Sequence, residues 1–206
     1  MIKYVLPTLA VGILAGYLNN QFGAALFNLF FSEYVFNFSL FTLLFLMGVL
    51  FAMDEKALAK VKAAGFKMFV FPFAVALGSL MGGFVGGVVL QIDVFASMSV
   101  CAGYGWYTLA GPLAGQLFGL KWGALGLAVN LLRELVTIAT TWIVAKLDRY
   151  APIAMGGATA MDTTLPMIVR YCGQDTLIIS FFSGFVLTLA APFTITAIAA
   201  LTTNSP

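Results

Sequence analysis

The chain has 206 residues, of which 62% are hydrophobic and 9% are charged, and its mean hydropathy is +1.03. Soluble domains carry about 25% charged residues, so this chain cannot cover a water-exposed surface and is predicted to be an integral membrane protein. The net charge of +2, the lack of histidine and two cysteines that form no CxxC pair give no indication of nucleic-acid binding, a metal site or a cofactor.

The hydrophobicity lies in long apolar runs rather than in alternating ten-residue segments, which indicates helices and not a β-barrel. We expect one all-α transmembrane domain over residues 1–206, a polytopic, multi-pass bundle in the cell membrane. The predicted spans in chain order are residues 4–18, 35–53, 66–90, 94–119, 122–147, 150–171 and 175–201. Two of them, 94–119 and 150–171, are interrupted, and the sequence leaves open whether each one crosses the membrane or re-enters.

The third predicted span is rich in glycine, which lets helices approach closely in a membrane. These glycines are Gly78, Gly82, Gly83, Gly86 and Gly87.

The basic residues predict the orientation of the chain in the membrane. With seven passes, one side carries Lys3, Lys56, Lys60, Lys62, Lys67, Lys121 and Arg170, and the other side carries Lys146 and Arg149. The positive-inside rule makes the first side cytoplasmic and places the C-terminus outside.

The two interruptions read GYGWYTLAGP (residues 103–112) and GGATAMDTTLP (residues 156–166). Glycine and proline break or kink a helix and free its backbone groups. Freed groups persist at membrane depth only inside a protein or along a cavity, so two breaks indicate a binding site. Two kinked helices without a ligand are the alternative.

The second interruption contains an aspartate, Asp162, near Thr159, Thr163 and Thr164. An aspartate in mid-span costs about 2.5 to 3.5 kcal/mol, which predicts a functional role in a polar cavity, either titrating or holding a cation. Capping of a half-helix is the competing interpretation.

The segment NLLRELVTIATT (residues 130–141) places Asn130, Glu134, Thr137 and Thr141 in one polar stripe, which we expect to face the bundle interior. Arg133 lies about 100° round the helix from Glu134, so its partner is either another carboxylate or a backbone carbonyl. A purely structural clamp between helices remains the alternative.

The first interruption contributes Tyr104, Trp106 and Thr108 to the predicted site. The aromatic residues of this interruption, Tyr104, Trp106 and Tyr107, fit either a cavity wall or the aromatic belt at the membrane interface. The Thr108 hydroxyl, like that of Thr163, is a candidate partner for a bound ligand.

Four motifs, LFLMGVL, GYGWYTLAGP, NLLRELVTIAT and GGATAMDTTLP, occur in this order, and the chain from about residue 40 onward resembles the lysine exporter family of prokaryotic membrane proteins. The resemblance implies a transporter rather than an enzyme, exporting L-lysine and analogues such as thialysine in exchange for protons. The family's two membrane-embedded acidic residues match Glu134 and Asp162. Members carry a further hydrophobic N-terminal part, so we expect a homodimer or a separately encoded membrane partner.

The predicted mechanism pairs the two carboxylates of Glu134 and Asp162 with the ammonium groups of lysine. The α-carboxylate of lysine would bind freed amides at a half-helix N-terminus, near Thr163 or Thr108. Without histidine, the same carboxylates would carry the protons. Two other functions stay open, a cation-selective channel and a non-transporting membrane subunit of a larger exporter. An intramembrane aspartyl protease is disfavoured because its GxGD pattern does not occur.

Overall fold

The computed structural model of the chain describes residues 67–203 and, before them, residues 11, 12, 14–19, 21, 34, 35, 38, 39, 42, 45, 46, 49 and 53. The chain divides into two compact units, Met1–Val49 and Leu50–Pro206, and residues 67–203 belong to the second. The predicted spans 4–18 and 35–53 lie for the larger part outside the described residues.

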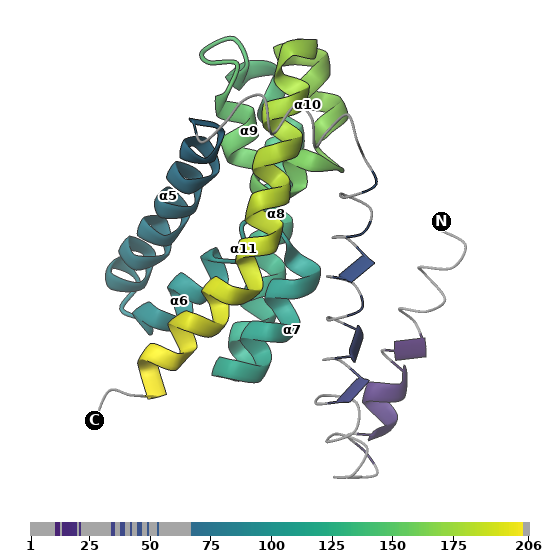
Figure 1. Ribbon diagram of the computed structural model, residues 1–206. Helices are drawn as coiled ribbons and strands as arrows, with labels where there is room; N and C mark the ends of the chain where they lie inside the picture. Colours follow the sequence, from purple (N-terminus) through teal and green to yellow (C-terminus); the bar gives the residue numbers. More distant parts are fainter. Residues whose placement is uncertain are drawn as a thin grey trace. The chain divides into compact units, whose positions relative to one another are not determined.

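Residues 67–203 form helices joined by turns and contain no strand, which confirms the predicted all-α membrane fold (Figure 1). The elements are α5 (Lys67–Val89), α6 (Val94–Cys101), α7 (Tyr107–Phe118), α8 (Leu120–Val144), α9 (Ala151–Gly156), η2 (Gly157–Met161), α10 (Leu165–Cys172), η3 (Gln174–Thr176) and α11 (Leu177–Thr203). Among the described residues, three stretches are long and apolar enough to cross a membrane: Phe69–Val89, Leu120–Val144 and Gln174–Thr202. They confirm the spans predicted at 66–90, 122–147 and 175–201.

The first interrupted segment re-enters the membrane instead of crossing it. α6 and α7 have 8 and 12 residues, so each is shorter than the roughly 30 Å hydrocarbon core requires. α6 runs back along the second half of α5, where a Cβ on Gly83 would lie 2.8 Å from the Cα of Met98. α7 then returns along the first half of α8, where Gly115 packs against Gly123. The hairpin therefore enters and leaves at the end of the bundle where α5 ends and α8 begins (Figure 1).

The second interrupted segment re-enters from the opposite end. α9 follows the end of α8, and the ring of Tyr150, just before α9, lies 6.5 Å from the ring of Phe71 near the start of α5. The turn of this hairpin reaches the first half of α11, where Ser180 Oγ donates a hydrogen bond to the carbonyl of Ala160 at 2.7 Å. α10 then runs back to the start of α11, so α9 and α10 occupy the other half of the bundle from α6 and α7 (Figure 1).

Re-entry corrects the predicted distribution of basic residues. Among the described residues, Lys67, Lys146, Arg149 and Arg170 belong to one end of the bundle and Lys121 to the other. The seven-pass prediction, which put Lys121 with Lys67 and put Lys146 and Arg149 opposite them, is wrong because both interrupted segments turn back. The remaining basic residues of that prediction, Lys3, Lys56, Lys60 and Lys62, lie outside the described residues.

Aromatic rings lie beside basic groups at both ends of the bundle. Lys121 lies over the ring of Trp122 at one end, and Lys146 lies over the ring of Trp142 at the other. Such pairs are typical of membrane-interface anchors, so both ends of the described bundle fit the two surfaces of a bilayer.

Four of the five glycines of α5 form two pairs with different surroundings. Gly83 and Gly87 are buried against α6, and a Cβ on Gly87 would lie 2.8 Å from the Cα of Val94. This confirms the predicted close packing of the glycine-rich span for these two residues. At Gly78 and Gly82, an added Cβ would meet open space, so these two residues do not take part in the contact with α6.

Replacement of Gly83 by alanine is therefore expected to destabilise the protein, because the added Cβ meets the backbone of α6 and packed interiors lose about 1 to 3 kcal/mol on overpacking. The Gly82→Ala variant is the matched control, since it adds the same atom one residue away in open space. Thermal unfolding of both purified variants in detergent measures the difference. Equal unfolding midpoints for the two variants would contradict the packing described for α5 and α6.

Candidate functional site

The two breaks meet in the middle of the bundle. The amide of Ala158, in the second break, donates a hydrogen bond of 2.8 Å to the carbonyl of Tyr104 in the first. Gly105 and Gly157 have φ angles of +103° and +61°, which favour glycine. A Cβ on Gly157 would clash with the Tyr104 carbonyl oxygen, and one on Gly105 would lie 2.9 Å from the carbonyl oxygen of Gly156. The glycines of both motifs are thus required where the two hairpin tips touch.

Asn130 of α8 binds the tip of the first hairpin. Its side-chain amide donates to the carbonyl of Val100, in the last turn of α6, at 2.9 Å, and to the carbonyl of Gly126 at 2.8 Å. Its side-chain oxygen accepts a 2.7 Å bond from the amide of Gly105. The Val100 carbonyl also accepts a longer, 3.3 Å bond from the amide of Gly103. Asn130 therefore adds a shorter bond at the carbonyl end of α6, at mid-depth, where an unsatisfied polar group costs several kcal/mol.

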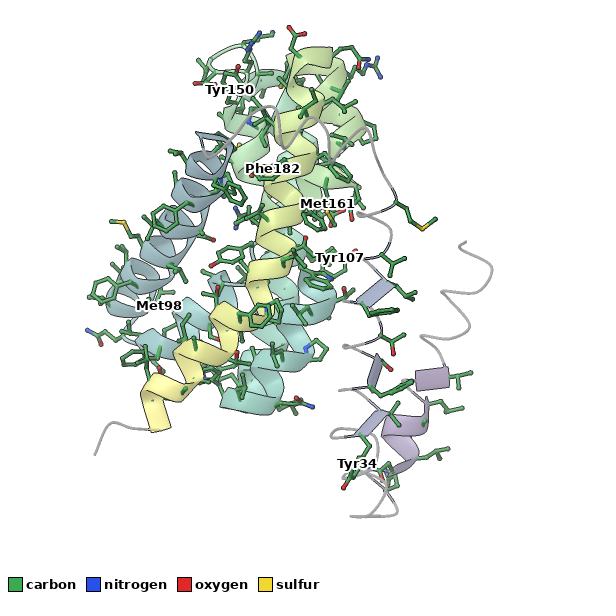
Figure 2. The ribbon with its side chains drawn as sticks, viewed as in Figure 1. Tyr34, Met98, Tyr107, Tyr150, Met161 and Phe182 are labelled. Carbon is green, nitrogen blue, oxygen red and sulfur yellow. The ribbon has the colours of Figure 1, made fainter. Side chains whose placement is uncertain are left out.

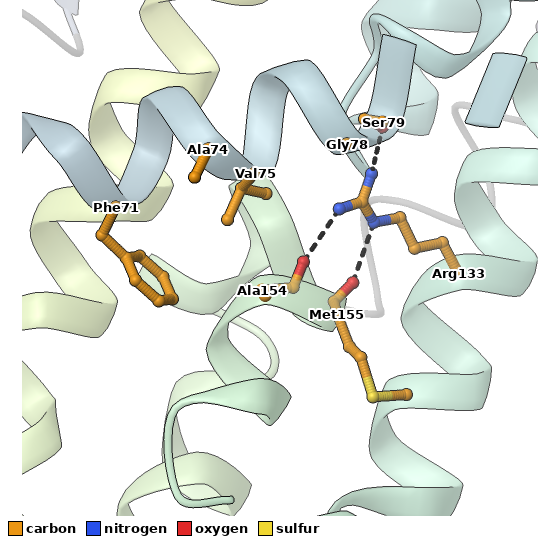
Figure 3. Close-up of a pocket in the computed structure, with 8 residues that line it drawn as sticks. All are labelled: Phe71, Ala74, Val75, Gly78, Ser79, Arg133, Ala154 and Met155. Carbon is orange, nitrogen blue, oxygen red and sulfur yellow. Dashed lines mark hydrogen bonds between the residues drawn. The ribbon is translucent and has the colours of Figure 1, made fainter. Parts of the chain in front are cut away.

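Arg133 serves the end of α9 in the same way (Figure 3). Its Nε donates to the carbonyl of Met155 at 2.8 Å and its Nη2 to the carbonyl of Ala154 at 2.9 Å. Its Nη1 donates to Ser79 Oγ at 2.9 Å, and Ser79 in turn donates to the carbonyl of Cys101, the last residue of α6, at 2.9 Å. The guanidinium therefore lies against the carbonyl end of α9, where a helix dipole favours a positive charge, and is linked to the carbonyl end of α6 through Ser79.

The open question about the partner of Arg133 is thereby resolved in favour of backbone carbonyls. Three of the five guanidinium N–H groups are used in these bonds. A cavity of about 500 Å³ adjoins the guanidinium, lined among others by Phe71, Val75 and Ser79 of α5 (Figure 3). Its other lining groups are apolar or backbone, so Arg133 supplies the charge of this space.

Tyr104 and Thr159 lie inside the hairpin tips. The ring of Tyr104 is 1% exposed, and its hydroxyl interacts with the side chain of Thr194 on α11. Thr159 Oγ1 donates to the carbonyl of Gly156 at 3.0 Å, and its own carbonyl accepts from the amides of Asp162 and Thr164. Both residues hold the turns in shape, and neither presents a hydroxyl to the surface of the bundle.

Glu134 lies on the buried stripe that the sequence predicted, together with Asn130, Thr137 and Thr141. Its side chain is 8% exposed, and its Oε2 atom has no hydrogen-bond partner among the described residues. A buried carboxylate oxygen without a donor is costly, because buried polar groups are normally paired. Glu134 therefore has one buried carboxylate oxygen without a donor in the described part of the chain.

Asp162 follows the turn of η2, immediately before α10. Its Oδ1 atom accepts a 2.6 Å bond from the amide of Thr163 and a 3.4 Å bond from the Thr163 hydroxyl. Asp162 and Thr163 are exposed, as is Thr108 in the first turn of α7, whereas Trp106 at the start of α7 is half-buried. The acidic residue thus lies on an accessible face of the bundle, next to the amino end of a half-helix.

Tyr107, an aromatic residue of the first motif, is the first residue of α7 and is half-buried. Tyr107 begins α7 two residues after Gly105, whose amide binds Asn130 one turn before Glu134 on α8. Figure 2 shows Tyr107 at mid-height of the bundle, away from Tyr150 at one end. Ser79 is a site residue that the sequence did not predict. Its neighbours in α5 gave no sign of a polar contact, whereas Tyr107 lies inside a motif already identified.

Comparison with known proteins gives one family. A family model described as "Lysine exporter LysO" matches residues 6–199, which begins well before the residue 40 at which the motifs start. The "Lysine exporter LysO" of Escherichia coli (strain K12) is 30% identical over 158 residues, 77% of this chain and 52% of that protein. A "Putative lysine exporter" of Haemophilus influenzae is 28% identical over 116 residues, 56% of this chain and 60% of that protein. The chain spans about half the length of the curated relatives it matches, and no solved structure matches it significantly.

The contact between the hairpin tips predicts a specific sensitivity at Gly157. A Gly157→Ala variant places a Cβ against the Tyr104 carbonyl of the other hairpin and also incurs strain from its positive φ. The Gly173→Ala variant is the matched control, because Gly173 has a φ of +98° but open space around it. We expect the midpoint of thermal unfolding to fall further for Gly157→Ala, by about 2 to 4 °C for each additional kcal/mol. If Gly173→Ala is as unstable as Gly157→Ala, the contact between the two hairpin tips does not contribute to the stability of the protein.

Proposed function

Because the chain belongs to the lysine exporter family described as LysO, we propose that it is a secondary transporter that exports L-lysine, and analogues such as thialysine, from the cytoplasm. The observation that carries this proposal is the location of two carboxylates, Glu134 and Asp162, beside the junction of two re-entrant hairpins. Broken helices that meet at the bilayer midplane are the usual setting of substrate sites in secondary transporters. The E. coli relative is named a lysine exporter, and the chain covers 52% of that protein.

The geometry suits a molecule with two ammonium groups and one carboxylate. Glu134 has an unpaired buried oxygen, and Asp162 is accessible, so each of them can bind one ammonium group. The amino ends of α7 and α10 both begin at the breaks, and neither has a side-chain N-cap bond. Helix amino ends favour anions, so the α-carboxylate of lysine binds there, close to Thr108 or Thr163.

The same carboxylates can couple export to protons. The chain contains no histidine, and Glu134 and Asp162 are the acidic residues closest to the hairpin junction in the described part. A carboxyl group that holds either a proton or the ammonium group of lysine links the two fluxes, because the proton displaces the substrate. This exchange makes the transporter a proton antiporter.

The positive-inside rule gives the sidedness of the site. The end of the bundle that carries Lys67, Lys146, Arg149 and Arg170 becomes cytoplasmic, and the end with Lys121 becomes external. The hairpin with Asp162 then enters from the cytoplasm.

We expect Asp162→Asn and Glu134→Gln to abolish or strongly reduce lysine efflux while the protein stays folded, because each variant removes one anion but keeps the shape of the side chain. The Asp148→Asn variant is the matched control, since Asp148 lies in the exposed turn after α8. The measurement is efflux of labelled lysine from proteoliposomes, with folding checked by gel filtration and thermal unfolding.

The same vesicles test the coupling. Wild-type efflux should accelerate as the external side is acidified at a clamped membrane potential, and Glu134→Gln should flatten this dependence. Wild-type activity in a well-folded Asp162→Asn variant would remove Asp162 from the mechanism. A rate independent of the proton gradient would exclude antiport, and a flux that does not saturate with lysine would indicate a channel.

The exposed site also bears on assembly. Asp162, Thr163 and Thr108 are exposed in the described unit, and a carboxylate facing lipid at mid-depth costs about 2.5 to 3.5 kcal/mol. We propose that a second copy of the chain covers this level of the bundle, and the open glycines Gly78 and Gly82 offer a surface for close helix contact.

Purified protein is therefore expected to have the mass of a homodimer in detergent and in lipid. Light scattering in detergent and single-molecule photobleaching in lipid measure this mass. A monomer that transports lysine would contradict the homodimer. If transport appears only when a second, separately encoded membrane protein is added, the functional assembly is heteromeric instead.

A further inference from the structure

Two consecutive segments of the described chain have the same order of elements. α5, α6 and α7 form a long helix, a short helix, a break and a second short helix, and α8, α9 and α10 repeat this order. The long helices α5 and α8 have 23 and 25 residues. The two segments, residues 67–118 and 120–172, are therefore candidates for an internal structural repeat.

The two segments are inserted from opposite ends of the bundle. α6 and α7 occupy the half where α8 begins, and α9 and α10 occupy the half where α8 ends (Figure 1). The long helices α5 and α8 run in opposite directions, since the start of α5 lies by Tyr150, after the end of α8. Repeats of this kind, related by an axis in the membrane plane, place a shared substrate site between their broken helices.

The sequence supplies a register between the two breaks. Thr108-Leu109 opens α7, and Thr164-Leu165 opens α10. When these dipeptides are aligned, Tyr107 corresponds to Thr163, and both carry a hydroxyl group. The amino end of α7 is thereby the counterpart of the amino end of α10, which lies beside Asp162.

Tyr107 has the surroundings that a ligand-binding group requires. It is half-buried, and its hydroxyl has no hydrogen-bond partner among the described residues. Glu134 also has an unpaired oxygen, and it lies one turn of α8 beyond Asn130, which binds the amide of Gly105 two residues before Tyr107. Two polar groups without partners at one level of a membrane bundle indicate a ligand that is polar on more than one side.

We propose that the segments 67–118 and 120–172 are inverted counterparts and that Tyr107 is a further substrate-contacting residue, whose hydroxyl donates a hydrogen bond to the α-carboxylate of the transported amino acid. The proposal rests on the lysine export proposed above and names the group that binds the substrate's anionic end. The amino end of α7 favours the same negative charge, so the helix dipole and the hydroxyl act together. Glu134 and Asp162 then bind the ammonium groups.

A diamine separates this role from a general effect on the site. Cadaverine has the two amino groups and the chain length of lysine but lacks the carboxylate. A Tyr107→Phe variant should raise the half-saturating concentration of lysine about tenfold, since a lost hydrogen bond to a charged group is worth that much or more. The cadaverine concentration that half-inhibits efflux of labelled lysine should be the same for this variant as for the wild-type protein.

The matched control is Tyr171→Phe, which makes the same change at the far, exposed end of α10 and should alter neither value. If Tyr107→Phe weakens the binding of both lysine and cadaverine, the proposal is wrong. It is also wrong if the variant changes the binding of neither. If wild-type protein does not transport lysine at all, the proposed function itself fails.

A second measurement does not require Tyr107→Phe to fold. Cysteine is placed at Thr108 or Thr163, both exposed, and its reaction with a membrane-impermeant maleimide is followed with and without lysine. Lysine should slow the reaction at both positions but not at a Leu147→Cys control in the exposed turn after α8. Protection of Thr163→Cys alone would show that the first hairpin contributes nothing to the site, and that result would overturn the inference while leaving lysine transport in place.

Discussion

A helix that ends in the middle of a membrane exposes carbonyl groups where there is no water to bind them, and the described bundle depends on how these groups are satisfied. α6 and α9 both end in this way. Asn130 and Arg133, three residues apart on α8, donate to the last carbonyls of both half-helices, with Ser79 of α5 completing the set. Because one helix serves both hairpins, their tips are held at the same depth and meet between Tyr104 and Ala158.

In this arrangement the positive and negative side chains of the bundle lie at different ends of the broken helices. The cationic Arg133 lies at the carbonyl ends of the half-helices, where it offsets their negative dipoles. The amide ends of α7 and α10 have no side-chain N-cap bond, and the acidic residues Glu134 and Asp162 lie near them without a basic partner within ion-pair distance among the described residues. The protein therefore satisfies the carbonyl ends of the broken helices with its own side chains, whereas the amide ends of α7 and α10 have no side-chain cap.

Several parts of the site were accessible from local sequence because helical spacing is a local property. The buried stripe of Asn130, Glu134, Thr137 and Thr141 follows from intervals of three and four residues, and the structure confirms it. The partner of Arg133 could not be predicted, since the carbonyls of Ala154 and Met155 come from another element and every residue offers a carbonyl. The role of Ser79 could not be predicted from the sequence for the same reason. Its acceptor is backbone, and its neighbours are those of an ordinary apolar span.

Local sequence was enough to establish that the chain is a helical membrane protein, where three of its spans lie and where two of its helices break. Hydropathy over about twenty residues and the conformational preferences of glycine and proline act within one segment, so they can be read without the fold. The packed bundle was needed to establish that both interrupted segments turn back, that Lys146 and Arg149 share an end with Lys67, and that the breaks touch. A re-entrant segment and a crossing one have the same apolar composition because both lie in hydrocarbon. The direction of α7 and α10 is set instead by packing against other helices, as where Gly115 of α7 contacts Gly123 of α8. Such contacts involve residues outside 94–119 and 150–171, so these two segments alone do not predict them.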